Sequence, residues 1–160
     1  MKNAYLYETK LGRILIAEDG TGITNLNLAP EGKNIGLDDS YVLNETEPLK
    51  EAAKQLFEYL EGTRRKFSVK LNPKGTSFQT RVWEALREIP YGETRSYKEV
   101  AGAVGNGKAS RAIGMANHNN PIMCIIPCHR VIGADKSLVG YAGGLDIKKY
   151  LLKLEQGKEA

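Results

Sequence analysis

Four short segments of the first half of the chain predict β-strands: turn residues separate the first three, and the fourth alternates cleanly between polar and apolar residues. The segments are 5–8, 13–16, 23–26 and 66–71. Asp19-Gly20 lies between the second and third segments, and Asp-Gly is a strong signal for a hairpin turn. The polar, glycine-containing stretch 29–46 predicts a loop.

A helical spacing of apolar residues follows Pro48, a residue type that favours the first turn of a helix. The apolar positions are Leu49, Ala52, Ala53, Leu56, Phe57 and Leu60. Gly62 predicts the end of this helix, because glycine accepts the left-handed conformation that commonly follows one. Residues 1–72 therefore predict a small antiparallel sheet covered by one helix. They contain neither cysteine nor histidine, so we expect a structural support there.

The rest of the chain, residues 73–160, is predicted to be mainly helical. Two helices begin with capping boxes, in which side chains and backbone amides bond reciprocally at the helix N-terminus. The capping pairs are Thr76 with Gln79 and Ser96 with Glu99. A third helix, 108–117, follows the turn Gly105-Asn106-Gly107. Helix, glycine-containing turn and helix form the helix-turn-helix plan, which many proteins share without touching DNA.

The third helix is predicted to have two contrasting faces. Its core face consists of Ala109, Ala112, Ile113 and Ala116, at helical spacing. Its outer face consists of Ser110, Arg111, Gly114, Asn117 and His118. The outer face has little bulk and one long cationic side chain. Such a helix can lie close against a groove of nucleic acid, and a solvated face with one arginine is the simpler alternative.

The C-terminal part is predicted to hold a hairpin and a final helix. Val131-Ile132 and Leu138-Val139 flank the hairpin turn. The glycines that follow permit close backbone approach to a ligand. The final helix begins near Asp146, and its predicted buried stripe is Ile147, Tyr150, Leu151 and Leu154. Glu155 lies at the edge of that stripe, where a carboxylate is usually solvated.

The formal net charge of +4 and the sequence pI of about 9.0 permit a polyanionic partner without requiring one. No apolar stretch approaches the ~20 residues of a membrane span, and the N-terminus lacks the apolar core of a signal peptide. We therefore expect a protein of the reducing cytoplasm without membrane contact.

An apolar run, 122–126, lies between two prolines and predicts a buried, strand-like segment. Cys128 comes shortly after this run, and His129 and Arg130 follow it directly. The thiolate is the nucleophilic form of cysteine, and cationic neighbours lower the pKa of a thiol. The segment therefore suits a reactive cysteine, and a buried structural cysteine is the alternative.

The chain has two cysteines, Cys124 and Cys128. On an extended segment their Cα atoms would lie about 13 Å apart, whereas a disulfide needs them within about 7 Å. A zinc site is another alternative, because the two cysteines with His118 and His129 supply four candidate ligands. Their spacing matches no common zinc motif, so we expect no metal and no cofactor.

Three blocks of sequence occur in order around the cysteine: Asn120-Pro121, Pro127-Cys128-His129-Arg130-Val131 and Tyr141-Ala142-Gly143-Gly144-Leu145. They resemble the acceptor region of the O6-alkylguanine-DNA alkyltransferases, or methylated-DNA–protein-cysteine methyltransferases. The resemblance is close over residues 77–155 and loose before them. It implies a ribonuclease H-like N-terminal domain, 1–72, and a winged helix-turn-helix-like C-terminal domain, 73–160, that binds DNA and accepts the alkyl group.

The resemblance implies a DNA-repair methyltransferase that acts once. The alkyl group of O6-methylguanine, and also of O4-methylthymine, would move to Cys128 of the protein itself. His129 would act as its base through a bridging water, and Glu155 would orient His129. Asn120 would brace the turn below the acceptor, and Tyr97 would donate a hydrogen bond to the base and crowd the adjacent phosphate.

The same resemblance implies that the third helix enters the minor groove of double-stranded DNA and that Arg111 replaces the extruded nucleotide. Its other DNA-binding residues would be Ala109, Ser110 and Gly114, with Tyr97 from the preceding helix. The base pocket would comprise Val131, Tyr141, Ala142 and Gly143. Some members have serine where this chain has Ala142, so a side-chain contact is lost there. We expect neither the N-terminal zinc site nor the phosphotriester-repair domain of some members, and we expect a monomer.

Two other functions stay open. A non-enzymatic lesion binder, like the alkyltransferase-like proteins, flips the base and transfers nothing, but those proteins lack the acceptor cysteine. A helix-turn-helix transcription regulator would read base edges, and the third helix carries one long basic side chain rather than a set suited to that task.

Overall fold

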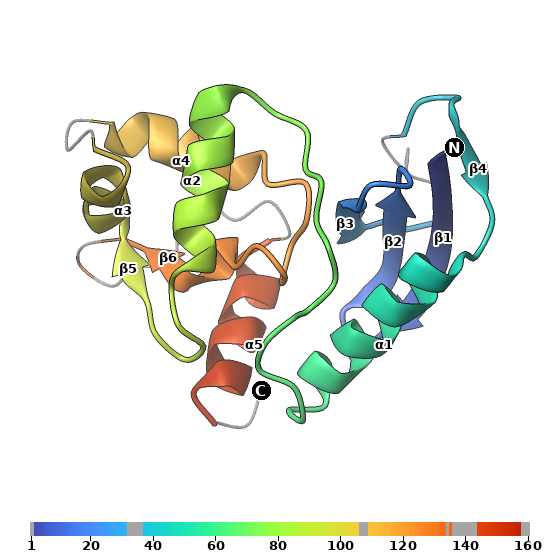
Figure 1. The fold of residues 1–160 in the computed structure, drawn as a ribbon. Coiled ribbons are helices and arrows are strands. Elements are labelled where there is room, and N and C mark those ends of the chain that lie inside the picture. Colours follow the sequence, from blue (N-terminus) through green and yellow to red (C-terminus); the bar gives the residue numbers. More distant parts are fainter. Residues whose placement is uncertain (1, 32–36, 106–108, 134, 136–143, 158–160) are drawn as a thin grey trace. The chain divides into compact units, whose positions relative to one another are not determined.

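The computed structural model describes residues 2–31, 37–105, 109–133, 135 and 144–157 (Figure 1). The chain forms two compact units, Met1–Lys74 and Gly75–Ala160, and each is described by itself. A sheet with one helix followed by a mainly helical unit confirms the predicted α+β class. No helix in the described ranges is long and apolar enough to cross a membrane.

A four-stranded sheet forms the N-terminal unit, with the strand order β3-β2-β1-β4. The strands are β1 (Lys2–Thr9), β2 (Gly12–Glu18), β3 (Ile23–Leu28) and β4 (Tyr41–Leu43). β1, β2 and β3 pair antiparallel, which confirms the first three predicted strands and extends each of them. Gly20, in the predicted hairpin turn between β2 and β3, has a φ of 87°.

Two predictions for this unit are wrong. β4 lies in the stretch expected to be a loop, and it pairs with β1 in parallel, so the sheet is mixed. The segment 66–71 forms no described strand and makes one isolated bridge, between Leu71 and Ile23. The side chain of Gln55 bonds both the amide of Ser68, at 2.9 Å, and its hydroxyl, at 2.8 Å. That amide is therefore satisfied by a helix side chain instead of a neighbouring strand.

Helix α1 (Glu47–Leu60) packs on this sheet, against β1, β2 and β3 (Figure 1). Pro48 lies in its first turn, and Gly62 follows its end with a φ of 83°, as the sequence predicts. The predicted buried stripe is right except at Phe57, which is 39% exposed, while Tyr59 is fully buried. The helix therefore completes the apolar core of the N-terminal unit.

Short elements and helices make up the C-terminal unit (Figure 1). They are α2 (Ser77–Arg87), β5 (Arg95–Ser96), α3 (Tyr97–Ala103), α4 (Ser110–His118), the 3₁₀ helix η1 (Cys128–Arg130), β6 (Val131–Ile132) and α5 (Leu145–Glu155). Both predicted capping boxes are present, at the starts of α2 and α3. β5 and β6 pair in parallel, which brings the start of α3 beside the end of the acceptor motif. The predicted hairpin after β6 and most of the turn before α4 lie outside the described residues.

Two helices bury polar residues that the predicted core faces did not include, although Ile113 and Ala116 of α4 are buried as predicted. In α4, Ala112 is exposed and Asn117 is buried, the reverse of the prediction. In α5 the buried positions are Lys148, Leu151, Leu152 and Glu155, so Leu151 is buried as predicted, whereas Ile147, Tyr150 and Leu154 are only partly buried. Asn117 and Lys148 each donate to a backbone carbonyl, and Glu155 accepts from charged partners. These bonds offset the cost of burying polar groups.

Gly75→Ala should destabilise the C-terminal unit. A methyl carbon built on Gly75 would lie 2.5 Å from Cη2 of Trp83, whose Nε1 donates to the carbonyl of Ala116 at 3.0 Å and fixes the ring. We expect a loss of about 1–3 kcal/mol in the free energy of unfolding, as in an overpacked core. Gly102→Ala is the control, because it lies within α3 and nothing is within 4 Å of the added carbon. Urea unfolding compares the two variants, and equal stabilities would contradict the prediction.

Candidate active site

The apolar run before Cys128 is coiled, so the predicted strand-like segment is wrong in shape, although it is buried as expected. The amide of Ile126 donates to the carbonyl of Ile122 at 3.0 Å, which closes a turn. Cys124, inside this turn, has a φ of 69°, in the left-handed region that residues other than glycine rarely adopt. Bonds within the segment thus replace the ladder that a strand would need.

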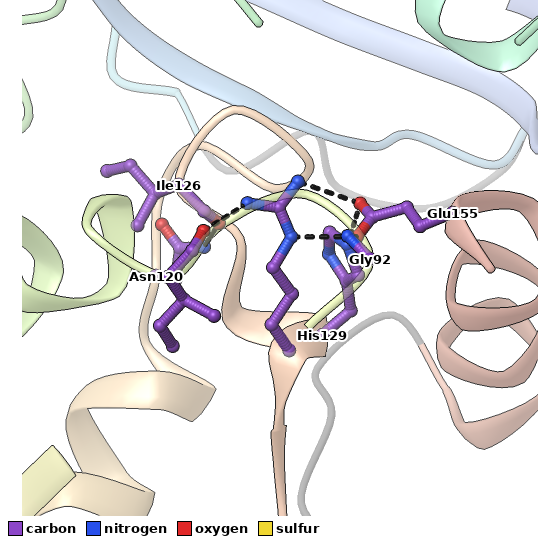
Figure 2. A network of polar contacts seen from close by, with 7 residues as sticks. Gly92, Asn120, Ile126, His129 and Glu155 are labelled. Atoms are coloured by element: carbon purple, nitrogen blue, oxygen red, sulfur yellow. Dashed lines mark hydrogen bonds and ion pairs between the residues drawn. The ribbon is translucent and has the colours of Figure 1, made fainter. Parts of the chain in front are cut away.

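Asn120 ties both ends of this coil together. Its Nδ2 donates to the carbonyl of Ile126 at 2.8 Å (Figure 2). Its Oδ1 accepts from the amide of Ile122 at 3.0 Å. The side chain is buried, so each of these bonds forms away from competing water. Asn120 therefore fixes the turn from which Cys128 follows.

Cys128 begins η1 and is 2% exposed, and its amide donates to the carbonyl of Ile126 at 2.7 Å. Both cysteines are free. Because the segment is coiled, the separation expected for an extended chain does not apply to them. Burial raises the pKa of Cys124, and the neighbouring Cys128 raises it further, so Cys124 remains a thiol at neutral pH. In the part of the chain that the structure describes, no three His, Cys, Asp or Glu side chains gather as a metal site.

The carboxylate of Glu155 joins the acceptor motif to α5 and to the turn before β5 (Figure 2). Its Oε2 lies 2.6 Å from Nε2 of His129. Nε and Nη2 of Arg130 donate to Oε1 and Oε2 at 2.8 and 2.9 Å. The amide of Gly92 donates to Oε1 at 3.1 Å. Glu155 is 6% exposed, so it differs from the solvated carboxylate that is usual at the edge of a helix stripe.

Arg130 has further partners that hold it in place. Its Nη1 donates to the carbonyl of Ile89 at 2.7 Å, and its guanidinium carbon lies 5.7 Å from the centre of the Tyr91 ring. Sequence reasoning considered Arg130 only as a positive neighbour of the thiol. Its position two residues after Cys128 gave no sign that it would bind Glu155 through both carboxylate oxygens.

The electrostatic environment keeps His129 neutral and Glu155 ionised at neutral pH. Burial lowers the pKa of His129 below its ordinary value; the Glu155 carboxylate opposes this shift, and the Arg130 charge adds to it. Burial alone would raise the pKa of Glu155, but hydrogen bonds from His129 and Arg130 outweigh it and hold that pKa well below its ordinary value. With Nε2 directed at Glu155, Nδ1 is the ring nitrogen that can exchange a proton on the other side.

Lys148 is a second buried charge that sequence reasoning missed. It is fully buried, and its Nζ donates to the carbonyl of Val131 at 2.6 Å. Burial lowers the pKa of Lys148 to about 8, and the nearby Cys128 opposes this shift. Positions 148, 151, 152 and 155 have a helical spacing, as do the positions of the predicted stripe that starts at Ile147. Charged residues are seldom assigned to a buried face, so the pattern was overlooked.

Tyr97 lies where α3 meets α4. Its side chain is partly buried, and its Cε1 would be 3.9 Å from a methyl carbon built on Gly114. Burial raises the pKa of Tyr97, Cys128 adds to this, and a hydrogen bond with Asn117 opposes it. The same Asn117 donates from Nδ2 to the carbonyl of Cys128 at 3.2 Å. The sequence predicts Asn117 on the outer face of the helix, whereas the structure buries it against the acceptor.

The predicted DNA-binding residues lie on α4 and at its start. Arg111 is exposed, whereas Ala109, Ser110 and Gly114 are partly buried. The surface of α4 thus offers one long cation, Arg111, beside small residues, and the side chain of Met115 is exposed as well. Tyr141, Ala142 and Gly143 lie outside the described residues, so their place in a base pocket stays a prediction.

Two family models match the chain, and together they span nearly all of it. Residues 4–73 match the ribonuclease-like domain of 6-O-methylguanine DNA methyltransferase, and residues 77–157 match the DNA binding domain of 6-O-methylguanine DNA methyltransferase. Both regions of the chain thus point to one family.

Relatives and solved structures agree with these matches. The methylated-DNA–protein-cysteine methyltransferase of Methanosarcina acetivorans is 55% identical over 94% of this chain and 96% of its own length. The constitutive enzyme of that name from Bacillus subtilis is 47% identical, over 93% of this chain and 92% of its own. The crystal structure of Mycobacterium tuberculosis OGT in complex with DNA has a TM-score of 0.87 at 40% identity, over 99% of this chain and 96% of the other.

The free energy of unfolding should decrease as the pH falls, because His129 and Glu155 both have a lower pKa in the folded state than in the unfolded chain. The unfolded chain then binds more protons, so stability falls below pH ~6.5 for His129 and below pH ~4.5 for Glu155. We expect the free energy of unfolding to fall first between pH 7 and pH 5.5, through His129, and again toward pH 4, through Glu155. Urea unfolding at pH 7, 5.5 and 4 measures it.

Two variants separate this effect from other acid sensitivity. His129→Gln should flatten the curve between pH 7 and 5.5, whereas Glu93→Gln, which removes an exposed carboxylate paired with Arg95, should leave it unchanged. A wild-type stability that stays constant from pH 7 to pH 4 would contradict the assignment.

Proposed function

The chain belongs to the 6-O-methylguanine DNA methyltransferase family, and from that premise we propose that it repairs DNA by moving the alkyl group of O6-alkylguanine to its own Cys128. The choice of Cys128 as the acceptor rests on its immediate surroundings. Cys128 and His129 lie on one turn of 3₁₀ helix, and the imidazole is locked by the buried carboxylate of Glu155 at 2.6 Å. Cys124, in contrast, is held as a thiol by its burial.

The reaction is a displacement at carbon. The sulfur of Cys128 forms a bond to the alkyl carbon while the bond from that carbon to O6 of guanine breaks. The electron pair of the broken bond goes to the base, which then takes up one proton. The thiol gives up one proton, so the net result is a thioether and an unmodified guanine. At its ordinary pKa a thiol is only a few per cent ionised at neutral pH, about 3% for a pKa of 8.5, so the proton needs an acceptor.

His129 is the acceptor that the geometry favours. Its imidazole is neutral in the resting state and can take the proton of Cys128 through a water molecule. The imidazolium that forms is stabilised by the carboxylate beside Nε2. Arg130 shares that carboxylate, which limits how strongly it attracts the proton. The proton on His129 therefore stays available for return to the departing base.

DNA containing O6-alkylguanine, and also O4-methylthymine, is the substrate that this mechanism serves. The alkyl group lies inside the duplex, so the base has to be turned out, which costs a few kcal/mol. Arg111 on the outer face of α4 is the side chain proposed to fill the space left in the stack, and Ala109, Ser110 and Gly114 permit close approach. A monomer suffices, because acceptor, base and helix all come from one chain.

The two other functions make different predictions. A lesion binder would hold the modified duplex without gaining mass, and a transcription regulator would bind one sequence whether or not it is methylated. The presence of Cys128 beside a neutral imidazole supports transfer over both.

One molecule of protein should repair one lesion. Incubation with a duplex containing one O6-methylguanine should add a single methyl group to the peptide that contains Cys128, and excess substrate should produce no second turnover. Cys128→Ser should abolish transfer and still bind the duplex, whereas Cys124→Ala should transfer at close to the wild-type rate. Intact and peptide mass spectrometry measures the adduct. Multiple turnovers, or methyl on Cys124, would overturn the assignment.

Arg111→Ala should slow repair of a duplex by at least about tenfold and repair of the free methylated base much less, because only the duplex requires a base to be turned out. Single-turnover rates on the two substrates measure the difference. Arg87→Ala removes an exposed positive charge from α2 and serves as the control for net charge. Equal losses on duplex and free base would show that Arg111 has no part in turning the base out.

The rate of transfer should fall on the acid side of pH 6.5, since the pKa of His129 lies below its ordinary value and only the neutral imidazole accepts a proton. Glu155→Gln removes the anion that favours the imidazolium, so the acid limb should move to lower pH and the plateau should drop. His129→Ala should remove the limb. Single-turnover rates from pH 5 to 9 measure these changes, with Glu93→Gln as the control. Three superimposable profiles would exclude the relay.

A further inference from the structure

The side chain of Asn117 connects the acceptor to the tyrosine at the start of α3. It is 1% exposed, and its Nδ2 donates to the carbonyl of Cys128 at 3.2 Å. The same side chain is hydrogen-bonded to the hydroxyl of Tyr97. The ring of Tyr97 lies over Gly114, which is one helical turn before Asn117 on α4. Asn117 thus stands between two groups that face the reaction.

The oxygen of the Asn117 amide shows which residue donates the hydrogen bond between Asn117 and Tyr97. Oδ1 of Asn117 is buried and has no hydrogen-bond partner among the described residues, so the bond to Tyr97 uses Nδ2. An amide nitrogen is a donor with two N–H groups, so the oxygen of Tyr97 accepts. The reverse placement of the amide is disfavoured, because Oδ1 would then meet the carbonyl oxygen of Cys128, and both atoms are acceptors.

This arrangement costs stability and therefore calls for an explanation. A buried carbonyl oxygen without a partner is unfavourable; an apolar side chain of similar size would avoid that cost but would remove the donor to the carbonyl of Cys128. Packing alone thus does not account for an asparagine at position 117. The feature that an apolar residue would lack is the pair of N–H groups.

We infer that Asn117 is a positioning residue that holds the oxygen of Tyr97 as an acceptor and so directs the hydroxyl proton of Tyr97 toward the extruded base. The inference rests on the proposed function. The partner is a ring nitrogen of the purine, and N3 is the acceptor that guanine carries on its minor-groove edge. Leucine at position 117 would let the hydroxyl turn, so the donor would no longer be fixed.

Substrate analogues test this directly. Single-turnover rates of wild type and Asn117→Leu are measured on duplexes that carry O6-methylguanine, its 3-deaza analogue or its 7-deaza analogue. The wild-type rate on O6-methylguanine tests the proposed function by itself. Asn117→Leu should be about tenfold slower on O6-methylguanine and on the 7-deaza analogue, the size expected for one oriented hydrogen bond. On the 3-deaza analogue, which lacks the acceptor N3, the two proteins should react at equal rates.

A double variant provides the independent check. In the Tyr97→Phe background, which lacks the hydroxyl, Asn117→Leu should cause no further loss on O6-methylguanine. Thermal unfolding should show that Asn117→Leu is folded; if it is not, Asn117→Ala takes its place with the same expectations. A loss of equal size on all three substrates, or a full loss in the Tyr97→Phe background, would overturn the inference and leave Asn117 a structural residue.

Discussion

The site depends on one buried carboxylate. Glu155 is the last residue of α5, and removing its charge from water costs several kcal/mol. Four hydrogen bonds offset this cost: two from Arg130, one with His129 and one from the amide of Gly92. These partners come from η1 and from the turn before β5, so one charge holds together three segments that are distant in sequence. Loss of Glu155 would leave the Arg130 guanidinium buried without its anion.

The same bonds set the balance of charge at His129. A carboxylate alone beside Nε2 would favour the imidazolium and make His129 a stronger base. Arg130 binds both oxygens of that carboxylate, and burial disfavours a charged ring. The outcome is an imidazole that rests neutral yet has a stabilising anion in place when it gains a proton. Burial, together with the Arg130 charge, outweighs the Glu155 carboxylate and sets the neutral resting state.

Local signals in the sequence predicted most of the fold. The capping boxes at Thr76 and Ser96 were found because their bonds form between residues three apart. The failures involve partners that are distant in sequence. The backbone of 66–71 was taken for a strand because it alternates, but the Gln55 side chain satisfies the amide of Ser68. β4 was missed because three residues paired in parallel with β1 leave no periodic pattern.

The errors at the site have a related cause. Apolar spacing identified a helical stripe on α4 and on α5, but the structure turns polar residues inward on both. Asn117, Lys148 and Glu155 are buried because each meets a partner on the acceptor motif. A single sequence does not reveal such partners. The family motif therefore supplied Glu155, and neither periodicity nor motif pointed to Lys148 or Asn117.

The 3₁₀ geometry of η1 decides how Cys128 and His129 can work together. On a strand, neighbouring side chains point to opposite faces, whereas with three residues per turn they diverge by about 120°. The thiol and the imidazole therefore lie nearer to one side than a strand would allow, but not on one line. The contact between Nε2 of His129 and Glu155 fixes the orientation of the imidazole ring. The coil that carries Cys128 into this turn is held at both ends by the side chain of Asn120.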